Sequence, residues 1–140
     1  MSLASRVSIW NRQRKWALFL EEFSPDETLQ VLDVGVSRYE AQGVSNIIEL
    51  NYPFPERLTA LGMDDTSELK SRYPTVNFVR YDGGRFPFAD QEFDIVWSNA
   101  VIEHVGDEEK QLFFLSELRR VAKQGFVTTP NRHFPIEVHT

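Results

Sequence analysis

The sequence predicts an α/β fold, in which helices cover both faces of a mostly parallel sheet of five strands. The first observation behind this prediction is a series of short apolar, β-branched segments at residues 30–36, 58–64, 76–82, 93–100 and 125–129. Several are nearly continuous apolar runs, which are typical of strands covered on both sides. The second observation is the helical or long crossover material between them. Parallel strands need such crossovers, and their right-handedness places helices on both faces.

Two segments carry the apolar spacing of an amphipathic helix. Residues 1–24 are expected to form one that packs on the remaining domain, residues 25–140, through Ile9, Trp10, Trp16, Leu20 and Phe23. Residues 107–123 are expected to form the other, with the Phe113–Phe114 pair in the core. Its predicted buried stripe consists of Leu112, Phe113, Leu115, Leu118, Val121 and Ala122. Its predicted exposed positions are Glu109, Lys110, Glu117 and Arg119.

Composition limits the classes of function. The 140 residues are 41% hydrophobic and 26% charged, have a formal net charge of −6, and include no cysteine. The acidic balance disfavours binding to nucleic-acid phosphates, and the lack of cysteine excludes disulfides, thiolate catalysis and zinc–thiolate sites. No apolar run approaches the length of a membrane span, and no secretory signal opens the chain. We therefore expect a single-domain cytoplasmic protein without nucleic-acid or membrane partners.

The N-terminal segment is a local exception, because basic and aromatic residues are mixed there. They are Arg6, Trp10, Arg12, Arg14, Lys15 and Trp16. A nucleic-acid patch is one interpretation of this mixture. The helical spacing of the apolar positions favours the other, a helix that packs on the domain.

Acidic or small polar residues close four of the predicted strands. The four ends read Asp33-Val34-Gly35-Val36-Ser37, Gly62-Met63-Asp64-Asp65, Asp82-Gly83-Gly84 and Ser98-Asn99-Ala100. In an open parallel sheet, ligands bind beyond the carboxyl ends of the strands, where the strand order reverses. The convergence of these residues therefore predicts a ligand site at that edge.

Each strand end allows a structural interpretation beside the functional one. Asp64 can accept hydrogen bonds from a ribose diol, or one of Asp64, Asp65 and their neighbours can cap the next helix. Asp82 with Gly83 suits the edge of an adenine, or forms a turn. Gly35 permits a tight turn, but the further glycines of a dinucleotide fingerprint are absent, which disfavours NAD and FAD.

The order of these segments resembles class I S-adenosylmethionine-dependent methyltransferases of the type 11 group. The resemblance covers residues 28–135, and the stretch from Asp82 to His104 is its most specific part. The segments that carry it read Val31-Leu32-Asp33-Val34-Gly35, Leu58-Thr59-Ala60-Leu61-Gly62-Met63-Asp64, Arg72-Tyr73-Pro74, Asp82-Gly83-Gly84-Arg85-Phe86-Pro87-Phe88, Glu92-Phe93-Asp94-Ile95-Val96-Trp97-Ser98-Asn99-Ala100-Val101-Ile102-Glu103-His104-Val105 and Thr128-Thr129-Pro130-Asn131-Arg132.

The resemblance implies a Rossmann-like fold and a site for S-adenosyl-L-methionine. Asp33 and Gly35 match the motif that faces the methionine portion, and Ser37 lies in the same loop. Asp64 matches the residue that holds the ribose hydroxyls, with Met63 or Asp65 beside the adenine. The remaining matches are Asp82 and Gly83 at the adenine edge, and Asn99 and Ala100 near the methionine group and the reacting methyl.

The sequence departs from the family pattern in two places. The glycine-rich first loop is replaced by Val36-Ser37-Arg38-Tyr39, in a segment at residues 38–56 that is longer than a minimal loop and helix need. The chain also stops just after the fifth predicted strand, whereas the full fold has two more. An uncovered edge invites pairing with another chain, so we expect a homodimer, a partner chain, or a truncated form of a longer protein.

His104 is the candidate catalytic residue, since a histidine just beyond the fourth strand can act as a general base near neutral pH. The alternative, which we favour, is that Glu103 and His104 anchor the loop. A metal site is not expected, because the spacing of His104, His133, Glu137 and His139 matches no ligand pattern.

Three functions follow from these observations. The first is a methyltransferase that acts on an unidentified small molecule. The second is a catalytically inactive methyltransferase-like module that works with a partner chain. The third, another nucleotide-binding domain, is weakened by the missing phosphate loop.

Overall fold

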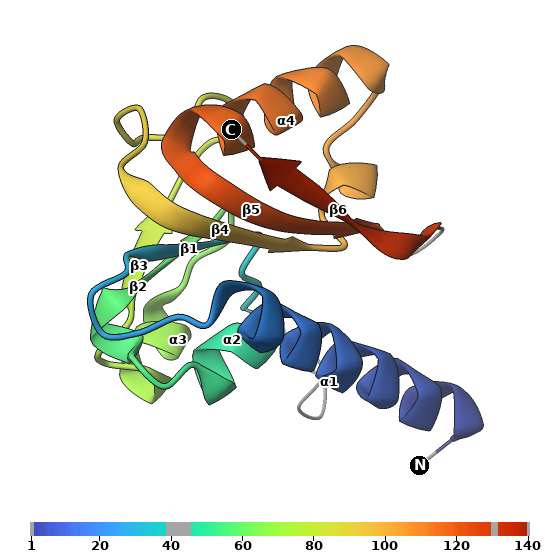
Figure 1. Ribbon diagram of the computed structural model, residues 1–140. Helices are drawn as coiled ribbons and strands as arrows, with labels where there is room; N and C mark the ends of the chain where they lie inside the picture. The colour runs from blue at the N-terminus through green and yellow to red at the C-terminus, as the bar shows by residue number, and fades with distance from the viewer. Residues whose placement is uncertain (1, 39–45, 130–131, 140) are drawn as a thin grey trace.

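The computed structural model describes residues 2–38, 46–129 and 132–139. Its centre is one six-stranded sheet with the order β3-β2-β1-β4-β5-β6. The strands are β1 (Val31–Val34), β2 (Leu58–Gly62), β3 (Asn77–Arg80), β4 (Phe93–Asn99), β5 (Ala122–Thr129) and β6 (Arg132–His139). The first five are parallel, as predicted, and β6 runs antiparallel to β5 (Figure 1). The strand order reverses between β1 and β4, so the predicted ligand edge is at their carboxyl ends.

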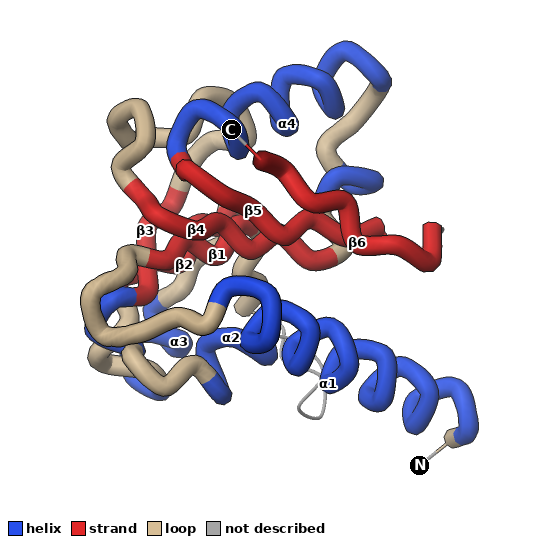
Figure 2. Tube along the Cα trace, viewed as in Figure 1, coloured by secondary structure: helices blue, strands red, loops and turns tan. Residues whose placement is uncertain are grey.

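Helices cover both faces of the sheet. The first three, α1 (Leu3–Phe23), α2 (Ile47–Asn51) and α3 (Ser67–Arg72), lie on one face, and α4 (Glu108–Val121) lies on the other (Figure 2). Two short 3₁₀ helices, η1 (Pro55–Arg57) and η2 (Ile102–His104), precede β2 and α4. Side chains alternate between the two faces of each strand, and both faces are apolar. Val31 packs on the α1 side and Leu32 on the α4 side, so the sheet is the middle layer of three.

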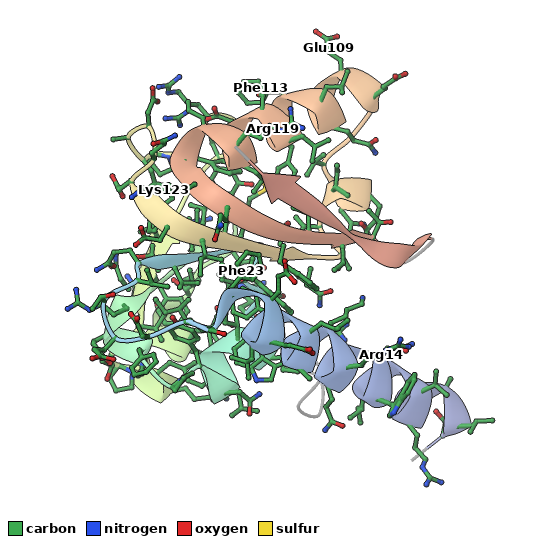
Figure 3. All side chains as sticks on the ribbon, viewed as in Figure 1. Arg14, Phe23, Glu109, Phe113, Arg119 and Lys123 are labelled. Atoms are coloured by element: carbon green, nitrogen blue, oxygen red, sulfur yellow. The ribbon has the colours of Figure 1, made fainter. Side chains whose placement is uncertain are left out.

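Helix α1 docks through a cluster of aromatic rings. Phe19 is completely buried, and its ring lies 5.1 Å from that of Trp97 and 6.1 Å from that of Phe126. Trp16 stacks on Phe19 at 5.4 Å. Phe23 joins the same packing at the end of the helix beneath the sheet (Figure 3). The helix and its packing were predicted. The prediction was wrong for Trp10, which is 58% exposed, and it did not include Phe19 among the packing residues.

Helix α4 lies where the spacing predicts it, but with a different buried face. Asp107 caps it by accepting a hydrogen bond of 3.0 Å from the Lys110 amide. The buried residues are Phe114, Glu117, Leu118 and Val121, whereas Leu112 and Phe113 are 61% and 47% exposed. Phe113 and Glu109 lie on the side away from the sheet (Figure 3). The predicted stripe was therefore wrong at Leu112 and Phe113, and the predicted exposure of Glu117 was wrong.

The sixth strand corrects the prediction of an uncovered edge at β5. β6 pairs with β5 from Gln124↔His139 to Thr129↔Arg132, with an irregularity between Val127 and Thr129. It therefore satisfies the backbone groups that β5 would otherwise present to another chain. The edge strand on this side of the sheet is β6.

Among the residues described here, no helix is long and apolar enough to span a membrane. Nothing in the structure tests the cytoplasmic location, which stays a prediction.

Candidate functional site

The strand ends converge at one edge of the sheet. The amides of Gly35 and Val36, beyond β1, both donate to the carbonyl oxygen of Leu61 in β2, at 2.8 and 3.2 Å. Gly35 adopts φ +105°, a conformation that a residue with a side chain rarely takes. A Cβ there would also collide with Val101, which follows β4. The ends of β1, β2 and β4 are therefore held together at Gly35.

The ends of β2 and β3 are also in contact. Tyr81 N donates to Gly62 O at 3.0 Å, and Arg80 Nε donates to Met63 O at 2.9 Å. Gly83 adopts φ +94°, and a Cβ on it would lie 2.9 Å from Met63 Cε. Met63 and Gly83, both predicted to flank an adenine, are thus neighbours.

Asp64 and Asp65 are adjacent but have different roles in the structure. Asp65 accepts hydrogen bonds from Ser67, 3.0 Å from its amide and 2.6 Å from its hydroxyl. These bonds at the start of α3 lower the pKa of Asp65. Asp64, half-buried at the end of β2, has no hydrogen bond or ion pair to another described residue. Asp65 is therefore engaged in the turn before α3, whose N-cap residue is Thr66, and Asp64 stays available.

Asp82 takes part in a turn, which was the structural alternative to binding an adenine. Its Oδ1 accepts a hydrogen bond of 2.9 Å from Gly84 N, which forms the turn that the sequence also allowed. The side chain is exposed at the tip of β3. The turn uses one carboxylate oxygen, so the other can still accept a hydrogen bond from a ligand.

At the end of β4, Asn99 and Ala100 are held from two sides. Asn99 Oδ1 accepts from Thr128 Oγ1 at 2.6 Å and from Lys15 Nζ at 3.3 Å. Ala100 N donates to Thr128 O at 3.1 Å, and its φ of +59° is unusual for a residue other than glycine. Helix α1 thus contributes Lys15 to the site, which sequence reasoning missed.

A small cavity of about 110 Å³ opens between α1, α2 and the ends of β1 and β4. Its lining comprises Arg12, Asp33, Val34, Gly35, Ser37, Asn46, Ile47, Ile48, Trp97 and Asn99. The backbone of Ser37 is bracketed by the Asn46 side chain, which accepts from Ser37 N at 3.1 Å and donates to Ser37 O at 2.7 Å. Tyr39 and the following residues to 45 lie outside the described residues. The predicted residues Asp33, Gly35, Ser37 and Asn99 therefore share one cavity.

Asp33 has a buried acidic neighbour that the sequence did not reveal. Glu49 of α2 is 4% exposed, and neither of its carboxylate oxygens has a hydrogen-bond partner among the described residues. Burial, and then the like charge of Asp33, raise the pKa of Glu49 well above its ordinary value. Burial likewise raises the pKa of Asp33 to about 6. Two carboxyl groups thus meet beside the cavity that Arg12 also lines.

His104 does not line the cavities that the described residues form around Asp33, Gly83 and Asn99. Its side chain is 78% exposed, and its Nε2 lies 3.5 Å from Glu103 Oε1. The carboxylate oxygens of Glu103, by contrast, are buried and have no hydrogen-bond partner within the described ranges. The prediction that these histidines and Glu137 form no metal site stays a prediction, because His133, Glu137 and His139 lie outside the residues whose side chains are described.

Two larger cavities border the site. One, of about 570 Å³, lies between the first half of α1 and the end of β4, and is lined by Leu3, Ala4, Val7, Asn11, Arg12, Lys15, Asn99 and Ala100. The other, of about 430 Å³, lies beside the end of β3 and is lined by Gly83, Gly84, Val105, Asp107, Glu109, Lys110, Phe113 and Phe114. Gly83 at the β3 end, and Asn99 and Ala100 at the β4 end, thus each line a cavity.

Comparison with solved structures shows that the fold recurs in methyltransferases. A SAM-dependent methyltransferase from Aquifex aeolicus is 21% identical, with a TM-score of 0.58 over 88% of this chain and 64% of that one. The PH0226 protein from Pyrococcus horikoshii OT3 is 23% identical, with a TM-score of 0.63 over 90% of this chain and 58% of that one. A putative methyltransferase in complex with the Haloferax volcanii Trm112 activator is 19% identical, with a TM-score of 0.60 over 86% and 52%.

The chain therefore spans less than two thirds of the length of these three structures. No curated protein matches it. The family model described as "Methyltransferase domain" matches residues 41–127, more than half of the chain. This family and the structural neighbours imply S-adenosylmethionine as the cofactor. By its sequence and its fold, the chain belongs to the methyltransferase domain family.

Proposed function

We propose that this protein transfers a methyl group from S-adenosylmethionine to a small-molecule acceptor. The proposal rests on the carboxylate of Asp64, which forms no hydrogen bond or ion pair with another described residue. It stands at the end of β2, beside the contacts that link this strand end to β1 and β3. A ribose diol offers two donors that a carboxylate can accept together.

The residues present fit the rest of the cofactor. Asp82 and Gly83 would meet the adenine edge, with Met63 against the ring, because Met63 and Gly83 are already neighbours. Asp33 would meet the ammonium of the methionine portion. The support for this assignment is that Asp33 lines the small cavity and lies beside a second buried carboxyl group, that of Glu49.

When bound, the cofactor supplies a sulfonium methyl group: the acceptor's nucleophile forms the new bond to carbon, the carbon–sulfur bond breaks, and its electron pair stays on sulfur. The protein's task is to position the acceptor and exclude water. Asn99 and Ala100 would do so at the β4 end, where Thr128 and Lys15 fix them. The acceptor's proton can leave to solvent.

Among the predicted site residues, His104 has the least structural support for its role, that of a general base. A general base must come within hydrogen-bond reach of the acceptor, but His104 points largely into solvent. The exposure favours the loop-anchoring interpretation. We therefore expect His104→Asn to retain cofactor binding.

Calorimetry with S-adenosylhomocysteine, the demethylated product, tests the proposal. Asp64→Asn should weaken binding by about 10- to 100-fold, because hydrogen bonds to a charged group contribute about 1.5–3 kcal/mol. Asp65→Ala is the matched control, since it removes a carboxylate one residue away that is already bonded to Ser67. It should leave the affinity within about threefold of the wild type.

Two results would contradict the proposal: no heat of binding for the wild-type protein at millimolar product, or equal losses in the Asp64 and Asp65 variants. Thermal melting of both variants shows whether a loss of binding reflects a loss of folding.

A second candidate function is a catalytically inactive module that works with a partner chain. It is supported by the neighbour that was solved with the Trm112 activator. The two candidate functions differ in whether the protein catalyses methyl transfer. If the protein binds S-adenosylhomocysteine but shows no methyl transfer to any acceptor in a broad screen, the module is favoured.

A further inference from the structure

Two buried carboxyl groups lie together beside the small cavity. Asp33, in β1, is 5% exposed and lines the cavity. Glu49, in α2, is 4% exposed, and its side chain interacts directly with that of Asp33. Glu49 is not one of the described residues that line the cavity, so any influence that it has on a ligand there must pass through Asp33.

A proton is what can join these two groups. An ionised carboxylate only accepts hydrogen bonds, so two ionised carboxylates cannot bond to each other. Within the described part of the chain, no residue donates to either oxygen of Glu49. When one of the two groups is protonated, its O–H can donate to the other, and burial favours the state with the smaller charge. The raised pKa values of Asp33 and Glu49, both caused first by burial, agree with a shared proton.

Ionisable neighbours of the pair come from α1 and from the end of α3. Arg12 lines the small cavity together with Asp33, and Lys15 of the same helix lines the larger cavity beside it. Tyr73, at the end of α3, lies within reach of the charge of Glu49. None of these three side chains donates a hydrogen bond to Glu49. Arg12 is the cation that could compete with a proton for Asp33, so the experiment must separate these two cases.

We propose that the Asp33–Glu49 pair gives up its shared proton when the ammonium group of the cofactor binds, and that Glu49 is the positioning residue that holds this proton on Asp33 beforehand. The O–H bond of the pair breaks, the proton passes to solvent, and an N–H of the ammonium donates to the freed oxygen of Asp33. The inference rests on the proposed function and adds a proton exchange to its cofactor site.

The exchange makes the affinity for the cofactor depend on pH. Binding favours the ionised pair, so the affinity should rise with pH while the free protein loses the proton, and level off once the proton is gone. Burial raises the pKa of Asp33 to about 6. The affinity should therefore rise about tenfold between about pH 5 and pH 7.

Calorimetry at pH 6 in two buffers with different enthalpies of ionisation counts the protons released on binding. The probes are S-adenosylhomocysteine and 5′-S-(3-carboxypropyl)-5′-thioadenosine, which lacks only the amino group. S-adenosylhomocysteine should release about half a proton or more, because Asp33 is then about half protonated in the free protein. The analogue should release none. The inference fails if S-adenosylhomocysteine releases no proton, which is the result expected if Arg12 already neutralises Asp33, or if the analogue releases as many.

A variant shows whether Glu49 holds the proton. In Glu49→Gln the amide can donate to Asp33 without a shared proton, so Asp33 should be ionised at pH 6. The variant should bind S-adenosylhomocysteine without proton release, and its affinity should stay within about twofold between pH 5 and pH 7. Glu68→Gln, an exposed change on α3, is the control and should behave as the wild type. Proton release that persists in the Glu49 variant, or that is lost in the control, would overturn the inference.

The failures of the two proposals are distinguishable. If the wild-type protein does not bind S-adenosylhomocysteine at millimolar concentration, the proposed function fails. If it binds S-adenosylhomocysteine with no release of a proton, only the proton exchange fails. Thermal melting at pH 5 and pH 7 checks that each variant is folded, and the comparison of the two ligands on the wild-type protein tests the exchange without any variant.

Discussion

Glu49 and Glu117 are equally buried, each 4% exposed, yet their surroundings differ completely. Glu117 belongs to α4 and Glu49 to α2, and these two helices lie on opposite faces of the sheet (Figure 1). A hydrogen bond from Arg120 lowers the pKa of Glu117. Burial, by contrast, raises that of Glu49. The comparison separates a buried carboxylate that stabilises the fold from a buried carboxyl group whose oxygens have no hydrogen-bond partner among the described residues.

The carboxylate of Glu117 is fully engaged. It accepts from Phe86 N at 2.8 Å and from Arg120 Nε and Nη2 at 2.7 and 3.0 Å. Arg120 also donates to Phe86 O, Phe88 O and Asp90. This network ties the loop after β3 to α4, which is a structural role.

The largest expected effect comes from breaking that network. Arg120→Met should destabilise the protein by about 3 kcal/mol, because it leaves Glu117 buried without its partner. Arg119→Met is the control on the exposed side of the same helix and should change stability by about 0.5 kcal/mol or less. Urea unfolding measures both. Equal effects would show that the network carries no special share of the stability.

A smaller, pH-dependent effect is expected at Glu49. Folding raises the pKa of Asp33 from 3.8 to about 6 and raises that of Glu49 from 4.5, so the native state retains protons that the unfolded chain releases. The stability from these groups is fully present below about pH 4 and is lost as pH rises through the folded pKa values. For Asp33 alone the loss is about 3 kcal/mol.

Glu49→Gln removes one of the two raised groups. It should stabilise the protein at pH 7 by on the order of 1–3 kcal/mol relative to the wild type, with little difference at pH 4. Unfolding by urea at both pH values measures this, and Glu68→Gln, an exposed change on α3, is the control. A gain that is the same at both pH values would mean that Glu49 does not hold a proton in the folded state.

The strands were predictable because burial on both faces leaves a direct mark on the sequence. The observed β2 and β4 begin at the predicted Leu58 and Phe93, and β1 and β3 lie within the predicted segments. The glycines and carboxylates at the strand ends were also identifiable, because each strand stops where its apolar run stops. Which of two adjacent carboxylates is engaged at the start of α3 was not identifiable, and the structure shows that Asp65 is, through its hydrogen bonds with Ser67.

The missed features lack a local pattern. Glu49 is in a five-residue helix, too short to show periodicity, and a buried glutamate looks like any surface residue in a sequence. Glu117 was placed outside, although its spacing to Arg120 is that of an ion pair in a helix. β6 contains Pro135, which argues against a central strand and is compatible with the edge position that it occupies.

The central claim is that the ends of β1, β2 and β3 bind the nucleoside of the cofactor. A crystal structure of the protein with S-adenosylhomocysteine tests it most directly. The ribose hydroxyls should lie within hydrogen-bond distance of Asp64, with the adenine beside Gly83. Density for the ligand at any other place, with Asp64 still facing solvent, would contradict the claim.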